Sequence, residues 1–215
     1  MSETQKTTHW GPVLALGGIW GFSEAALGMY LRTCASSVSG SIMTGAAFLF
    51  LAAAWTLSPR ARTVAAVAGT AAGFKLLDAL LLGLPVLHGA IGNPIFAIAM
   101  EGAAFLVIVS VVAKPLAAKP LGQALSGGLG ALVAVNLFPL VKYATGVAPC
   151  VTGTAYPLAL YYAPLAVMLS CLTVPLGVRA GASLAAFEAR AWRPRWLSPA
   201  ALAASLGALI LLRVL

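Results

Sequence analysis

The chain has 215 residues, of which 61% are hydrophobic and 8% charged, and its mean hydropathy is +0.98. Ordinary soluble domains are about half apolar and about a quarter charged. This composition excludes a soluble globular domain and indicates a multi-pass membrane protein. The net charge of +8 implies no nucleic-acid partner, because basic residues normally gather on one side of a membrane protein.

Long apolar segments follow one another along the chain. A membrane-spanning helix needs about 20 mostly apolar residues. Division at charges, prolines and polar clusters predicts spans at residues 11–31, 40–57, 63–84, 93–113, 121–142, 157–178 and 197–214. Their apolarity is continuous, which excludes the alternating pattern of a transmembrane β-barrel. We therefore predict an all-α membrane protein, a single polytopic bundle of six to seven transmembrane helices in contact with lipid.

Four regions are expected. They are a cytoplasmic N-terminal tail at 1–10, a six-helix transmembrane bundle at 11–180, an interfacial amphipathic segment at 181–196 and a seventh transmembrane helix at 197–215. The third region combines arginines with Trp192 and Trp196, which is typical of helices that lie at a membrane surface.

The basic residues predict the orientation. If the N-terminus and the even-numbered turns share one side, that side carries nine of them: Lys6, Arg60, Arg62, Lys114, Lys119, Arg179, Arg190, Arg193 and Arg195. The other side carries three, Arg32, Lys142 and Arg213. The side richer in Lys and Arg faces the cytoplasm. We expect an integral protein of the inner or plasma membrane with a cytoplasmic N-terminus.

Four ionisable residues, Glu24, Lys75, Asp78 and Glu101, fall inside the predicted spans. A charge at the centre of a spanning helix costs roughly 2.5–3.5 kcal/mol on insertion scales, so such residues usually face the bundle interior and pair or bind a solute. Their positions along the spans place all four in one layer. Lys75 and Asp78 are spaced i, i+3, which allows an ion pair on one helix face.

Two interpretations of this layer remain open. The four residues form a structural ion-pair cluster, or they bind a small cationic or hydrogen-bonding solute or relay protons. Three carboxylates against one lysine leave a formal charge of −2, which requires protons, a cation or another base. The second interpretation follows from this imbalance.

The first span has a face of small residues, Gly17, Gly21, Ala25 and Gly28, beside Glu24. Small residues spaced by four allow close approach between membrane helices. The pattern predicts tight packing, either within the bundle or against a partner membrane subunit.

Residues on the predicted outer side are candidate solute contacts, namely His88, Asn93, Tyr143, Thr152 and Tyr156. Loops on a rigid scaffold often carry binding residues. Asn93 has an alternative role, because it precedes Pro94 and is expected to cap the fourth span.

Cys34 and Cys150 both fall on the outer side, where a disulfide between them would persist. The alternative is two free thiols. The sequence holds no metal-ligand spacing and no nucleophile motif of known enzyme classes. We expect no metal, no cofactor and no enzymatic activity.

Residues 18–28, with Asn93-Pro94 and Glu101-Gly102, resemble the substrate-binding component of energy-coupling factor transporters. The resemblance covers residues 10–180 and implies that the small face of the first helix docks on a membrane coupling protein. It also implies that a small solute enters from outside beneath the loops. The expected function is thus an integral membrane solute-binding or transport subunit that captures a small cationic molecule. The alternative is a non-catalytic membrane subunit of a larger complex, such as a redox complex, with a structural or proton-relaying charge cluster.

Overall fold

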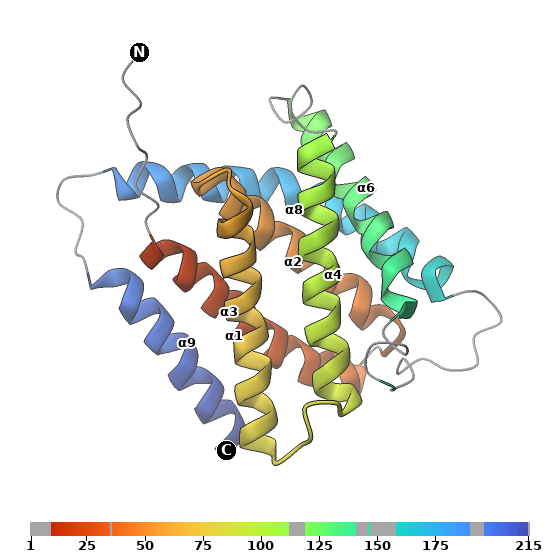
Figure 1. The fold of residues 1–215 in the computed structure, drawn as a ribbon, viewed down its shortest axis with the longest axis vertical. Helices are drawn as coiled ribbons and strands as arrows, with labels where there is room; N and C mark the ends of the chain where they lie inside the picture. The colour runs from red at the N-terminus through yellow and green to blue at the C-terminus, as the bar shows by residue number, and fades with distance from the viewer. Residues whose placement is uncertain are drawn as a thin grey trace.

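The computed structural model describes residues 10–34, 36–111, 119–140, 146, 158–189 and 196–214, without the side chains of residues 30–37, 158 and 159. Within these residues every regular element is a helix, and seven helices are long and apolar enough to span a membrane. The predicted all-α polytopic bundle is therefore confirmed. In chain order the helices are α1 (Trp10–Cys34), α2 (Ser36–Leu57), α3 (Ala61–Leu82), α4 (Gly89–Val111), α6 (Pro120–Leu137), the 3-10 turn η1 (Phe138–Leu140), α8 (Leu158–Glu188) and α9 (Leu197–Val214) (Figure 1).

Local signals explain several helix ends. Pro120 opens α6 directly after the extended residue Lys119, because proline needs no hydrogen-bond partner at the first helical position. Gly83 ends α3 with a φ of 62°, a left-handed conformation that glycine adopts without steric cost. The N–H of Leu84 then bonds the carbonyl of Ala79 at 2.9 Å, which satisfies one of the free carbonyls at the helix end.

The helices pack in two groups. In one group α8 lies against α2 and α6, and in the other α1 lies against α3 and α9. Helix α8 runs across the molecule, transverse to α3 and α4, in the view of Figure 1. The groups are joined by α4, which contacts both α3 and α6, and by α2, which contacts both α1 and α8.

Four glycines lie where the helices of the first group meet. We call Gly127, Gly130, Gly177 and Gly181 the glycine interface. A Cβ atom at Gly177 would overlap the carbonyl oxygen of Leu49, and one at Gly127 would overlap that of Ser170. Because glycine has no side chain, the backbone of α8 lies close to the backbones of α2 and α6. Such close approach is common where membrane helices meet at small residues.

The predicted end of the sixth span differs from the structure. Helix α8 continues through residue 180 to Glu188, so residues 181–188 extend the sixth span and do not begin a separate interfacial helix. Residues 176–188 are rich in alanine and leucine and contain no proline, so nothing in them ends the helix. Residues 190–195 lie outside the described part of the chain.

The cap predicted at Asn93 was wrong. Helix α4 begins at Gly89, and Asn93 lies inside it, 4% exposed. His88 takes the capping position, because its Nδ1 accepts a hydrogen bond from the Ala90 N–H at 3.2 Å. This is the bond that serine or asparagine usually makes at a helix start.

Candidate functional site

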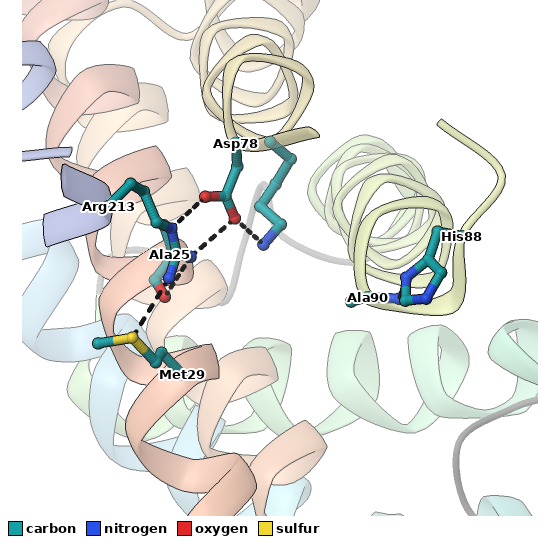
Figure 2. Close-up of polar contacts among 7 residues, drawn as sticks. Ala25, Met29, Asp78, His88, Ala90 and Arg213 are labelled. Carbon is teal, nitrogen blue, oxygen red and sulfur yellow. Dashed lines mark hydrogen bonds and ion pairs between the residues drawn. The ribbon is translucent and has the colours of Figure 1, made fainter. Parts of the chain in front are cut away.

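Three charged side chains from α3 and α9 meet in the second group of helices (Figure 2). The ammonium of Lys75 donates a hydrogen bond to Oδ2 of Asp78 at 2.9 Å. The guanidinium of Arg213 binds the same carboxylate through both Nε, on Oδ1, and Nη2, on Oδ2. We call Lys75, Asp78 and Arg213 the ion cluster.

The ion cluster is buried. The side chain of Asp78 is 1% exposed, and those of Lys75 and Arg213 are 6% and 9% exposed. Arg213 also reaches α1, where its Nη1 lies 3.2 Å from Sδ of Met29 and its Nη2 lies 3.5 Å from the carbonyl oxygen of Ala25. One arginine therefore ties the last turn of α9 to both α3 and α1.

A second set of buried groups lies beside the ion cluster. Glu24 of α1 and Glu101 of α4 are 7% and 5% exposed, and their carboxyl groups interact electrostatically with each other. We call them the carboxyl pair. Glu24 also interacts electrostatically with Lys75. The two sets are thus joined through the lysine, and four helices contribute to the whole site.

Neutral side chains complete the surroundings of the carboxyl pair. The hydroxyl of Thr44, from α2, hydrogen-bonds the carboxyl of Glu101. The indole of Trp20, one turn before Glu24 on α1, is fully buried and stacks on Phe50 with ring centroids 6.2 Å apart. The indole N–H approaches Glu24 but makes no well-formed hydrogen bond with the described residues. Trp20 therefore lies one turn from Glu24 with an indole N–H that no described residue accepts.

The charge balance differs from the value expected from sequence. Glu24, Asp78 and Glu101 carry three formal negative charges, and Lys75 and Arg213 carry two positive ones, which gives 2 − 3 = −1 for the described side chains. The value of −2 counted only the four predicted residues, and Arg213, which was assigned to the outer side, adds one positive charge because it binds Asp78. Its position two residues from the chain end hid this role, since terminal arginines of spans usually reach water.

The small face of α1 is divided between neighbours. Gly17 and Gly21 pack against Thr70 and Phe74 of α3. Ala25 is buried beside Phe74 and Leu209. At Gly28 an added Cβ would meet no described atom within 4 Å. Most of the small face of α1 therefore packs against other helices of the same chain.

Several candidate residues are not part of this site or lie outside the described residues. His88 is exposed and caps α4. The described part of the chain does not include Tyr143, Cys150, Thr152, Tyr156 or the side chain of Cys34. The disulfide and three of the outer contacts therefore stay predictions.

Sequence reasoning missed Arg213, Thr44 and Trp20 as members of the site. Thr44 and Trp20 lie in apolar spans, where a lone hydroxyl or indole gives no distinctive signal. Arg213 did have a distinctive signal, because it is the only charged residue of the last predicted span. Charged residues in a span usually pair with another charge.

Among the described residues no group of three or more His, Cys, Asp or Glu could hold a metal ion. Comparisons of the chain with protein-family models, with curated proteins and with solved structures found no match. The chemistry of the site must therefore be argued from its own residues.

Proposed function

We propose that this integral membrane protein is a solute-binding subunit of a transport system and that it captures a small cationic molecule from the extracytoplasmic side. The carboxyl pair, Glu24 and Glu101, is the proposed binding site. The proposal assigns no catalytic step to these residues. It includes the cytoplasmic N-terminus and the membership in energy-coupling factor transporters to which the sequence resemblance points.

One observation carries the proposal. Two buried carboxyl groups from different helices, Glu24 and Glu101, interact electrostatically, and the formal charges of the five ionisable side chains described above sum to −1. Burial of an unpaired charge is costly, and like charges close together repel. A bound cation removes both costs.

Binding of amines to the purified protein in lipid nanodiscs tests the proposal. We expect that Glu24→Gln and Glu101→Gln each weaken the binding of butylammonium by about tenfold or more, the effect of losing about 1.4 kcal/mol. Glu188→Gln, on the far end of α8, is the matched control and should bind as the unmodified protein does. Equal affinity in all four proteins would overturn the proposal.

A second role is favoured by the ion cluster itself. Asp78 is bonded by two cations, as expected of a structural device that fixes the packing of α9. In this alternative the chain is a non-catalytic subunit of a larger membrane complex. Co-purification from the native host separates the two, because a transport subunit should bring an ATPase pair and a coupling protein, and an accessory subunit should bring a redox or other complex.

A further inference from the structure

We infer that the Asp78 carboxylate, the Ala25 carbonyl and the Met29 thioether form a guanidinium-binding site, at which small guanidinium solutes compete with Arg213 and release α9. We call these three groups the guanidinium site. The site shares no residue with the carboxyl pair, and it does not depend on the proposed function.

The guanidinium of Arg213 is bound, among the described residues, by atoms of α1 and α3. The two oxygens of Asp78 accept hydrogen bonds from Nε and Nη2, the second of them at 2.9 Å. Sδ of Met29 lies 3.2 Å from Nη1, and the carbonyl oxygen of Ala25 lies 3.5 Å from Nη2 (Figure 2). A guanidinium fits this set better than an ammonium does, because its planar fork binds both oxygens of a carboxylate at once. The site is therefore complete without any atom of α9 except the guanidinium that fills it.

The guanidinium site lies near the end of α3 and beside the last turn of α9. Met29, which contacts Nη1, is 45% exposed. A Cβ atom at the neighbouring Gly28 would meet no described atom within 4 Å. The Met29 side of the site therefore faces the surface of the protein, where a small solute can reach it.

Apart from Arg213, α9 is attached to the bundle by few side chains. It packs on α1 and α3, and its buried residues are Ser198, Ser205 and Leu209. Of these three, Leu209 is the apolar one, and it packs with Ala25. Lipid is as apolar as leucine, so apolar contacts alone give little drive for helix association in a membrane. Arg213 is therefore the main attachment of α9.

Lys75 makes the exchange of one guanidinium for another feasible. Its ammonium lies 2.9 Å from Oδ2 of Asp78, so Asp78 keeps a cationic partner while Arg213 leaves. Arg213 is in the last turn of α9, from which a long side chain can extend to the membrane surface. Neither charge is left buried and unpaired, which is the state that makes the opening of a buried ion pair costly.

Arg213→Ala vacates the guanidinium site and tests it directly. Ethylguanidinium is the fragment that this substitution removes, and butylammonium has the same charge without the planar donors. Calorimetry in nanodiscs should show that Arg213→Ala binds ethylguanidinium about tenfold or more tightly than the unmodified protein, whose own arginine competes. The affinity for butylammonium should rise less.

Asp78→Asn combined with Arg213→Ala is the control, and it should lose the gain in affinity for ethylguanidinium. Binding at the carboxyl pair is common to all three proteins and cancels in the comparison. No gain in Arg213→Ala, or equal gains for both probes, would overturn the inference and leave the proposed function intact.

Release of α9 is measured with Arg213 in place, which keeps the inference testable if Arg213→Ala does not fold. A Cβ atom at Gly18 would lie 3.6 Å from Cβ of Ser205 on α9, within the range of a disulfide. Gly18→Cys with Ser205→Cys, in a chain whose natural cysteines are replaced by alanine, should therefore cross-link under copper-phenanthroline oxidation.

Ethylguanidinium should slow this cross-linking by about tenfold once about nine in ten copies have released α9. Butylammonium at the same concentration should slow it less, because it cannot bind both oxygens of Asp78. A cross-linking rate that ethylguanidinium leaves unchanged would overturn the inference.

Discussion

The glycine interface and the ion cluster join helices of the same bundle with different residues. Between α8 and its neighbours the contact is made by absent side chains, so that Gly127 and Gly177 bring backbone against backbone. Between α9 and its neighbours the contact depends on long side chains, because Arg213 reaches across to α3 and α1. The glycine interface is therefore weakened when side-chain atoms are added, and the ion cluster is weakened when side-chain atoms are removed.

This difference has a physical origin. Without water to exclude between helices, close packing and polar contacts are the forces available within a membrane. Close packing is shared by many atoms and fails when backbones are pushed apart. A buried ion cluster concentrates its contribution in a few groups, and the loss of one group leaves the others with uncompensated charge.

The largest effect is expected at Asp78. Asp78→Ala removes the carboxylate that both Lys75 and Arg213 bind, and loss of one member of a buried pair costs roughly 3–5 kcal/mol. The free energy of unfolding, measured in mixed detergent and dodecyl sulfate micelles, should fall by that amount.

A triple variant provides the control for this effect. Lys75→Met, Asp78→Leu and Arg213→Met together remove all three charges, and apolar replacement of a whole buried cluster is often close to neutral. The triple variant should therefore be more stable than Asp78→Ala. A triple variant as unstable as the single one would mean that the cluster acts through shape and not through charge.

The next effect is expected in the glycine interface. Gly127→Ala places a methyl group on the Ser170 carbonyl, and overpacking of this kind typically costs about 1–3 kcal/mol. The same unfolding measurement should show this loss. Gly69→Ala is the matched control, because its added Cβ meets no described atom within 4 Å. It should stabilise α3 by about 0.5–1 kcal/mol, and equal losses at both positions would contradict the role of close approach.

The smallest effect is expected at the hydrogen bond between α2 and α8. The Ser41 hydroxyl donates to the Tyr162 carbonyl at 3.0 Å. Hydrogen bonds between membrane helices contribute about 0.6 kcal/mol on average, and Ser41→Ala should reduce stability by that amount. Ser23→Ala removes a hydroxyl that bonds within its own helix and should have no effect on the α2–α8 contact. A loss above about 2 kcal/mol at Ser41 would show that this interface also depends on polar contacts.

The sequence was sufficient to predict the fold class and the seven spans because apolar length is a property of each segment by itself. Helix boundaries were harder wherever two signals competed. At Asn93-Pro94 a good capping pair lies inside α4, because His88 satisfies the helix start one turn earlier. Beyond residue 180 a change in polarity was taken for the end of a helix that continues to Glu188.

The candidate site was predicted only in part, because sequence patterns are local and some of its contacts are not. Glu24, Lys75, Asp78 and Glu101 stand out in apolar spans, and the Lys75–Asp78 pair follows from helical spacing alone. The contact of Arg213 with Asp78 joins residues 135 positions apart. No local pattern encodes such a contact, since it depends on how α9 is placed against α1 and α3.

The length of α8 has a mechanical consequence. Its 31 residues extend over about 46 Å at 1.5 Å per residue, whereas the hydrocarbon core of a bilayer is about 30 Å thick. The large exposed apolar side chains of α8 end at Leu176, and the exposed Arg179 follows. The remaining nine residues, from 180 to 188, add about 14 Å, and Gly181 among them still packs against Ala53 of α2. A small tilt of α8 against α2 and α6 would therefore produce its largest displacement at the Glu188 end of the helix.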